Sequence, residues 1–161
     1  MSKSFDWRMG RSCVFKNLIH LIFVTKYRRT VFTEKMLNRL HTIFNETCKQ
    51  MDAELIEYGG EEDHIHLMVS CHPKRAISSL VGKLKGKSSY YLRKEFRPQL
   101  KKKLWGNKLW SPSYCVVSCG GGALETVRKY VAEQRKEPLE RHVKQSKTLI
   151  KTYAKQKCVK V

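Results

Sequence analysis

Two histidines separated by one residue are the clearest chemical signal in this sequence. His64 and His66 stand in a segment, His64–Ser70, whose residues alternate between polar and apolar. Because successive side chains of a strand point to opposite faces, both imidazoles lie on one face while Ile65 and Leu67 enter the core. Two imidazoles on one face can bind a single metal ion, although most His-x-His pairs in strands are simply partly exposed histidines.

Acidic residues directly precede the histidine pair. Glu61, Glu62 and Asp63 occupy the turn before it. Their carboxylates can serve as further metal ligands, or they can accept a hydrogen bond from an imidazole and fix its orientation. This neighbourhood favours a metal site at the start of the strand.

A tyrosine and a glutamine form a second candidate pair near the C-terminal end. Tyr130 and Gln134 are four residues apart in a predicted helix, 124–136, so the phenol and the amide lie one turn apart on one side. Nearby cations favour a phenolate and attract a phosphate. The cations here are Arg128, Lys129 and Arg135. The helix alone fits a nucleophile and a rim tyrosine equally well, with Tyr114 and Tyr91 as the next candidates.

Three consecutive glycines, Gly120, Gly121 and Gly122, stand just before this helix. Glycine adopts positive φ angles at no steric cost and restrains the chain little. The helix that carries Tyr130 is therefore able to pack on its own protomer or on a partner.

The composition is strongly basic. Lysine and arginine total 33 against 14 acidic residues, which gives a formal net charge of +19 over 161 residues. This excess predicts a polyanionic partner, and we expect nucleic acid rather than a membrane, because no helix sets a clean apolar face against a lysine-rich one. The longest apolar run, 18–24, is too short to span a bilayer, and a signal-peptide segment is lacking, so we expect a cytoplasmic protein.

Basic residues interleaved with aromatic residues predict contacts to unpaired bases, since rings stack on bases while cations follow the backbone. Candidate DNA-binding residues are Lys26, Tyr27, Arg28, Arg29, Lys83, Lys85, Lys87 and Arg93. A third such segment, 101–108, contains Trp105. We expect some of these rings, Trp105 and Trp110 among them, to belong to the core instead.

The elements that must position these residues follow from hydrophobic periodicity and from turn signals. We expect strands at 14–25, 54–58, 64–70 and 114–118, and helices after Thr33, after Pro73 and at 124–136, with a loop at 101–110. This order predicts an α+β fold with a mainly antiparallel sheet and helices on one face. We expect a loose segment at 1–12, one domain at 13–138, and a basic helix or tail at 139–161.

Several stretches, taken together and in this order, resemble the single-tyrosine HUH transposases of single-strand insertion sequences, the insertion-sequence 200/605 type. These stretches are Thr25–Arg28, Asp63–Leu67, Leu104–Trp105, Leu109–Tyr114 and Tyr130–Gln134. The resemblance spans most of the chain, from about residue 15 to residue 134. It implies a ferredoxin-like HUH fold and a C-terminal helix that carries the tyrosine.

The resemblance also implies an activity. Tyr130 would attack single-stranded DNA beside subterminal hairpins and form a 5′-phosphotyrosine, while His64, His66 and Gln134 would hold Mg²⁺ or Mn²⁺. It further implies a homodimer, with Gly120, Gly121 and Gly122 as a hinge that lets Tyr130 act at the partner's histidines. No nucleotide cofactor is needed, because the tyrosyl ester keeps the phosphodiester energy.

Two alternatives stay open. One is a catalytically idle protein that binds DNA or RNA hairpins, which the charge and the aromatic residues fit equally well. The other is a related HUH enzyme that acts on dispersed palindromic repeats.

Overall fold

The computed structural model describes residues 7–119. The chain divides into two compact units, Met1–Gly120 and Gly121–Val161, and every described residue belongs to the first. The predicted helix at 124–136, the three glycines and the basic tail lie outside the described residues. The proposed domain limits, 13–138, therefore stay a prediction.

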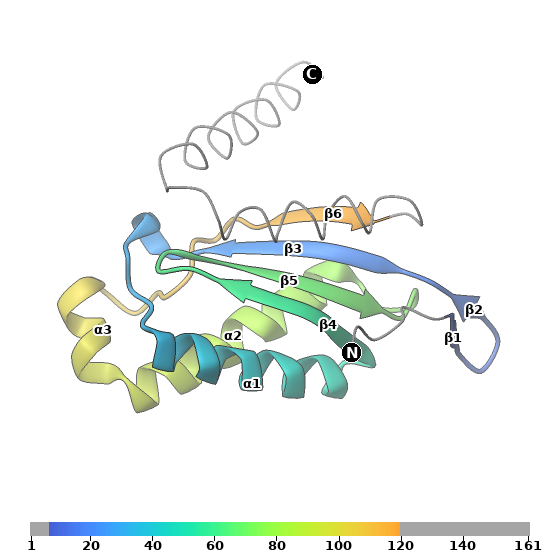
Figure 1. The fold of residues 1–161 in the computed structure, drawn as a ribbon, viewed down its shortest axis with the longest axis horizontal. Helices are drawn as coiled ribbons and strands as arrows, with labels where there is room; N and C mark the ends of the chain where they lie inside the picture. Colours follow the sequence, from blue (N-terminus) through green and yellow to red (C-terminus); the bar gives the residue numbers. More distant parts are fainter. Residues whose placement is uncertain (1–6, 120–161) are drawn as a thin grey trace, which may run out of the picture. The chain divides into compact units, whose positions relative to one another are not determined.

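A four-stranded antiparallel sheet forms the centre of the described unit (Figure 1). Its strands are β3 (Leu18–Val24), β4 (Ala53–Gly60), β5 (His64–Cys71) and β6 (Cys115–Cys119). They lie side by side in the order β4-β5-β3-β6, so β3 and β5 are the central strands. A separate two-stranded ribbon pairs β1 (Arg8–Met9) with β2 (Val14–Phe15). Residues 8 and 9 of the segment expected to be loose are thus part of a strand pair.

Two long helices cover one face of this sheet, as expected (Figure 1). Helix α1 (Glu34–Gln50) begins at Thr33, whose hydroxyl accepts a hydrogen bond from the backbone N–H of Met36 at 3.4 Å. Helix α2 (Ile77–Glu95) follows β5. The element order β3-α1-β4-β5-α2-β6, together with the strand order, is the ferredoxin-like arrangement that the family resemblance implies.

The core lies between the sheet and the two helices. Ile65 and Leu67 of β5 are fully buried there, together with Leu21 of β3, Leu40 of α1 and Leu84 of α2. Burial of such aliphatic side chains contributes about 1.5–3 kcal/mol each before entropy is counted. Because strand side chains alternate, the even-numbered residues of β5 point to the other face of the sheet.

The predicted loop at 101–110 is wrong in its first part. Helix α3 (Arg97–Lys103) occupies it, with Pro98 in its first turn and Leu100 as its buried anchor. A short 3₁₀ turn, η1 (Lys26–Arg28), follows β3. Within residues 7–119, every helix is too short or too polar to cross a bilayer.

Candidate active site

His64 and His66 lie next to each other on β5, as the alternating pattern predicts. Their ring centroids are 4.9 Å apart and the rings are nearly perpendicular, at 77°. Both rings belong to the sheet face that α1 and α2 do not cover, because Ile65 and Leu67 fill the opposite face. Both residues are partly exposed.

Asp63 holds the His64 ring in one orientation. The Nδ1–H of His64 donates a 2.6 Å hydrogen bond to Oδ1 of Asp63, and both side chains are only 16% exposed. A neutral imidazole that donates through Nδ1 keeps its lone pair on Nε2. The sequence prediction that an acidic neighbour orients an imidazole is consistent with this contact.

Burial by itself raises the pKa of Asp63, but other effects outweigh it. The hydrogen bond that His64 donates and the nearby positive charge of Arg28 hold the pKa of this carboxyl below its ordinary 3.8. The guanidinium of Arg28 lies 3.5 Å from Oδ2 of Asp63. Asp63 is therefore a carboxylate at neutral pH, and it acts only as an acceptor.

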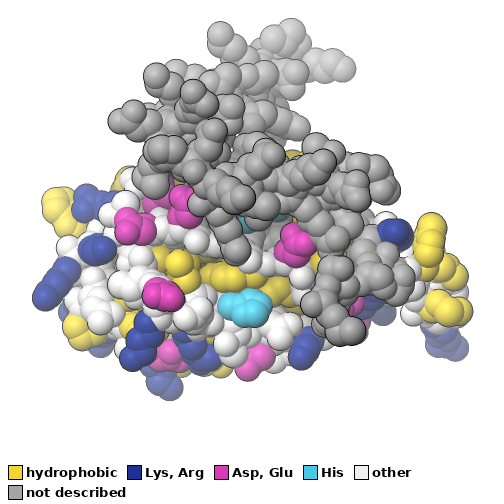
Figure 2. All heavy atoms as spheres, viewed as in Figure 1, with side chains coloured by type: hydrophobic (Ala, Val, Ile, Leu, Met, Phe, Trp, Pro, Cys, Tyr) yellow, Lys and Arg dark blue, Asp and Glu magenta, His cyan; other side chains and the backbone are white. Residues whose placement is uncertain are grey.

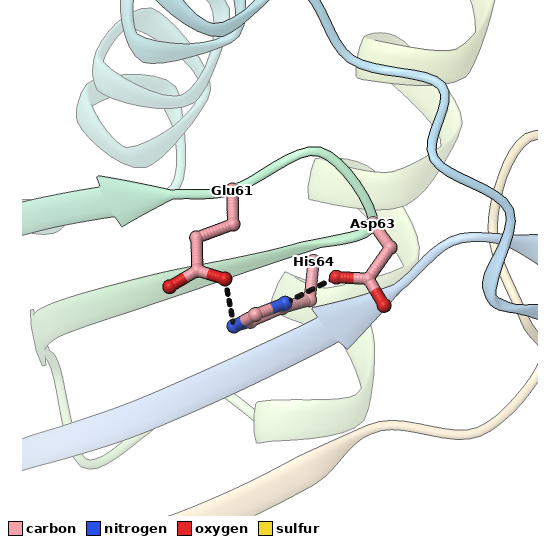
Figure 3. Close-up of side chains that lie close together, drawn as sticks. All are labelled: Glu61, Asp63 and His64. Atoms are coloured by element: carbon pink, nitrogen blue, oxygen red, sulfur yellow. Dashed lines mark hydrogen bonds and ion pairs between the residues drawn. The ribbon is translucent and has the colours of Figure 1, made fainter. Parts of the chain in front are cut away.

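Glu61 completes a group of possible metal ligands (Figure 3). Its Oε2 lies 4.0 Å from Nε2 of His64, and one ligand atom from each of Glu61, Asp63 and His64 lies within 4.8 Å of the others. Carboxylate oxygens suit both Mg²⁺ and Mn²⁺, and two ligand bonds of about 2.1 Å reach across the 4.0 Å between Glu61 and His64. The residues present thus fit a divalent metal ion.

Another histidine, from the adjacent strand, contacts the pair. Nε2 of His20 on β3 lies 3.2 Å from Nδ1 of His66, and the two rings stack with centroids 5.2 Å apart. His20 is 6% exposed, and this burial lowers its pKa from 6.5, although the charge of Glu57 opposes part of the shift. Sequence reasoning did not identify His20. The available signal was a histidine inside an otherwise apolar strand.

The predicted DNA-binding residues Lys26, Tyr27 and Arg28 form the turn η1, directly after β3. Tyr27 has φ 59° and Arg28 has φ 51°, a left-handed conformation that non-glycine residues rarely adopt. The Tyr27 ring is 70% exposed, with the Lys26 ammonium 4.8 Å above it. The turn presents an aromatic ring and cations to solvent beside the Asp63 loop.

Arg29 joins this turn to the segment after α3. Its guanidinium lies 5.5 Å above the Trp105 ring and donates to the carbonyl of Lys103 at 3.3 Å. The Trp105 ring is 78% exposed, whereas Trp110 is 6% exposed and packs against Phe23 and Phe32. The expectation that both tryptophans are core residues is therefore correct for Trp110 only.

The predicted DNA-binding residues of α2 have different surroundings. Lys85 donates to the carbonyls of Ser111 and Ser113 at 2.8 and 2.7 Å, and burial lowers its pKa to about 8. Lys83 is exposed, and Lys87 donates to the side chain of Gln50. Arg93 donates to the carbonyl of Gly106 at 3.4 Å.

On the face seen in Figure 2, lysine and arginine side chains spread along the left end and the lower edge, with acidic side chains among them. The described part of this face thus carries dispersed positive charge rather than one basic patch. The DNA-binding assignments of these residues stay predictions.

The remaining predicted site residues lie outside the described residues. These are Tyr130, Gln134, Gly120, Gly121 and Gly122. Their roles as nucleophile, third metal ligand and hinge stay predictions.

Similar proteins place this site in a family. The family model described as "Transposase IS200 like" matches residues 13–134. The ISDra2 transposase TnpA of Deinococcus radiodurans is 35% identical over 129 residues, which cover 80% of this chain and 91% of that protein. The transposase for insertion sequence element IS200 of Salmonella typhimurium is 31% identical over 118 residues, covering 73% of this chain and 76% of that protein.

Solved structures agree with this match. A candidate transposase from Deinococcus radiodurans R1 has a TM-score of 0.65 at 33% identity, covering 79% of this chain and 97% of that one. A REP-associated tyrosine transposase bound to a REP hairpin has a TM-score of 0.53 at 12% identity, covering 77% of this chain and 67% of that one. At this identity the match shows a similar fold alone. Because the sequence match spans the whole ferredoxin-like unit, including the histidine pair and the acidic turn, the chain belongs to the IS200-like transposase family, whose members are metal-dependent enzymes of DNA transposition.

Proposed function

We propose that this transposase cleaves and rejoins single-stranded DNA beside subterminal hairpins, with Tyr130 as the nucleophile and a divalent metal ion held by His64 and His66. The observation that carries the proposal is the adjacent pair of imidazoles on β5, one of which Asp63 holds with Nε2 as its acceptor nitrogen. As part of the same proposal, the protein acts in the cytoplasm, which the sequence predicts.

The donor set determines which ion fits. His64, His66 and Gln134 would supply two imidazoles and one amide, with Glu61 near enough to contribute a carboxylate oxygen. These donors can bind either Mg²⁺ or Mn²⁺. Because two of them are imidazoles, we expect the site to bind Mn²⁺ more tightly than Mg²⁺ in vitro. When bound, the ion polarises an oxygen of the scissile phosphate.

Tyr130 would carry out the covalent step. Its hydroxyl oxygen bonds to the phosphorus and gives up its proton to solvent, while the bond from phosphorus to the 3′ oxygen breaks and that oxygen takes up a proton. The products are a 5′-phosphotyrosine and a free 3′-hydroxyl. Attack of a 3′-hydroxyl on the tyrosyl ester reverses the same bonds and joins strands, which is why no nucleotide cofactor is required.

The turn η1 and Trp105 support a contact with unpaired bases. Tyr27 and Trp105 are large exposed rings, each with a cation of the chain over its face. Exposed rings beside cations suit stacking on bases together with contact to phosphates. The REP-associated transposase of similar fold is bound to a REP hairpin, which agrees with hairpin DNA as the ligand.

We also propose a homodimer with composite sites, in which Tyr130 of one chain acts at His64 and His66 of the other. In the described unit β6 is an edge strand, next to β3 only, and its Val116 and Val117 are 37% and 43% exposed. An edge strand with exposed valines is a common place for pairing with another chain. This exposure supports association of two copies.

The test is a denaturing gel of labelled single-stranded element ends incubated with the full chain and Mn²⁺. A covalent protein–DNA adduct is expected, and it should be lost in Tyr130→Phe and retained in the matched control Tyr114→Phe. His64→Ala, His66→Ala or EDTA should also prevent it, because the ion would no longer be held. An undiminished adduct in Tyr130→Phe would assign the nucleophile to another residue.

Subunit mixing tests the composite site. Tyr130→Phe protein mixed with a His64→Ala, His66→Ala double variant should regain cleavage, because one site of each mixed dimer draws its histidines and its tyrosine from different chains. Continued inactivity after demonstrated subunit exchange would reject this arrangement for cleavage.

A native gel-shift assay with the same DNA, run beside the denaturing gel, separates the alternatives. Tight hairpin binding without any adduct would favour a catalytically idle hairpin-binding protein. Cleavage of dispersed palindromic repeats in preference to element ends would favour the related HUH enzyme. The relatives that share 31–35% identity with this chain are insertion-sequence transposases, and this favours element ends.

A further inference from the structure

Each of the two histidines on β5 has a close polar partner at Nδ1, which the proposed chemistry does not by itself require. In each ring Nδ1 has a close partner within the described unit: Asp63 for His64, at 2.6 Å, and His20 for His66, at 3.2 Å. The first partner is a carboxylate beside its histidine in the chain. The second comes from another strand, 46 residues away in sequence.

The strand register explains how His20 reaches His66. On the antiparallel pair β3 and β5, Ile22 lies opposite His66 and His20 lies opposite Met68. Directly opposite residues point to the same face, and so do residues two apart along a strand, so His20 is the diagonal neighbour of His66 on that face. This position brings the two rings into contact, and their planes lie 18° from parallel.

A hydrogen bond between two neutral imidazoles has two possible directions. If Nε2–H of His20 donates, then His66 carries its own proton on Nε2 and cannot bind a metal ion through that atom. If Nδ1–H of His66 donates, then Nε2 of His66 holds the lone pair that a metal ion needs. Binding of the ion through Nε2 therefore requires His20 to be the acceptor.

We infer that His20 is a positioning residue, which accepts a hydrogen bond from Nδ1–H of His66 and so holds that ring in its metal-binding tautomer. The inference rests on the proposed metal site. It gives His66 the kind of support that Asp63 gives His64, with a neutral acceptor in place of a carboxylate. Partners of this kind, which contact a ligand residue and not the ion, typically change metal affinity by about 10- to 100-fold.

Two substitutions of His20 separate positioning from packing. His20→Phe keeps an aromatic ring stacked on His66 but removes the acceptor nitrogen. His20→Gln restores an acceptor through its amide oxygen while removing the ring. The matched control is His41→Phe, the same replacement at an exposed histidine of α1 whose ring contacts Tyr58.

The primary measurement is Mn²⁺ affinity of the full chain, by titration calorimetry and by the electron paramagnetic resonance signal of bound Mn²⁺. We expect His20→Phe to weaken binding by about 10- to 100-fold, His20→Gln to recover most of the loss, and His41→Phe to bind as wild type does. Wild-type affinity in a His20→Phe protein with an unchanged circular dichroism spectrum would overturn the inference. So would an equal loss in His20→Gln, because packing alone would then account for both variants.

A second measurement needs no variant and covers the case in which His20→Phe fails to fold. ¹⁵N-histidine spectra of the metal-free wild-type chain should show the His66 proton on Nδ1. A proton on Nε2 of His66 would overturn the inference. Failure of the proposed function looks different, since wild type would then bind no Mn²⁺ or His66→Ala would bind it with undiminished affinity.

Discussion

Replacing Asp63 by asparagine tests whether the carboxylate beside His64 prepares this ring for metal binding. The substitution keeps the shape of the side chain and removes its charge. The asparagine amide can donate to Nδ1 of His64, which selects the tautomer with a proton on Nε2 and removes the metal-binding lone pair. The backbone carbonyl of residue 63 still accepts from the N–H of Thr25 at 2.9 Å, so the turn is retained.

The magnitude follows from the geometry of the contact. A 2.6 Å hydrogen bond to a carboxylate whose side chain is 16% exposed is charge-assisted and little screened. Hydrogen bonds to charged groups contribute about 1.5–3 kcal/mol, and about 1.4 kcal/mol corresponds to a tenfold change in a binding constant. We therefore expect Asp63→Asn to weaken Mn²⁺ binding by about 10- to 100-fold, with a parallel rise in the Mn²⁺ concentration needed for the covalent DNA adduct.

A matched control makes the result specific. Asp52→Asn removes the same charge at the turn between α1 and β4, where Asp52 pairs with Arg75 at 3.1 Å. Residue 52 has φ 54°, a conformation that asparagine tolerates, so the control should fold normally. Mn²⁺ affinity of Asp52→Asn should equal that of wild type. An Asp63→Asn protein that melts normally and binds Mn²⁺ within about threefold of wild type would refute the reasoning.

Three further predictions concern the fold and the DNA contact. Ser88→Ala leaves the buried Nε1–H of Trp110 without its 2.9 Å acceptor, so urea unfolding should show a loss of about 1–3 kcal/mol, and an unchanged midpoint would contradict this. Folded Lys85 releases its proton near pH 8 and unfolded lysine near 10.5, so wild type should gain stability relative to Lys85→Met as pH rises through this window, whereas a constant difference would argue against a lowered pKa. Single strands with hairpins should bind better than duplex, with a log–log salt slope of about −0.7 per phosphate neutralised, and equal affinity for duplex would count against the proposed ligand.

Features that depend on neighbouring residues could be predicted from the sequence. The alternation through His64–Ser70 is sufficient to place His64 and His66 on one face, because side-chain direction in a strand has a period of two. The start of α1 is equally local, since Thr33 supplies an oxygen to a backbone N–H only three residues on. The order of these elements then restricts the fold to few topologies.

Helix α3 shows where periodicity becomes insufficient. Seven residues with one buried anchor, Leu100, give no repeat that a pattern can detect. Pro98 in the first turn was the available signal, because proline is favoured at the start of a helix. The lysines at 101–103 were interpreted as a loop for their charge, although lysine is a good helix former.

The different environments of the two tryptophans depend on distant residues. Trp110 is buried because α2 provides Ser88 as an acceptor for its indole N–H and because Phe23 and Phe32 pack on its ring. Trp105, five residues earlier, contacts Arg29 and stays exposed. Both residues are tryptophans in one short segment of the chain, so only their tertiary partners explain why one is buried and the other exposed.

The β3–β5 register connects these observations to the active site. His20 meets His66 only because Ile22 lies opposite His66, and Asp63 stays beside His64 while its carbonyl accepts from Thr25 at the end of β3. A slip of one residue would turn His20 toward the helices and bring Leu21 to the site, which would bury an imidazole among apolar side chains. The apolar residues that oppose such a slip lie on the other face of the same strands. The core between sheet and helices thus determines that His20, and not Leu21, is the neighbour of His66 on the site face.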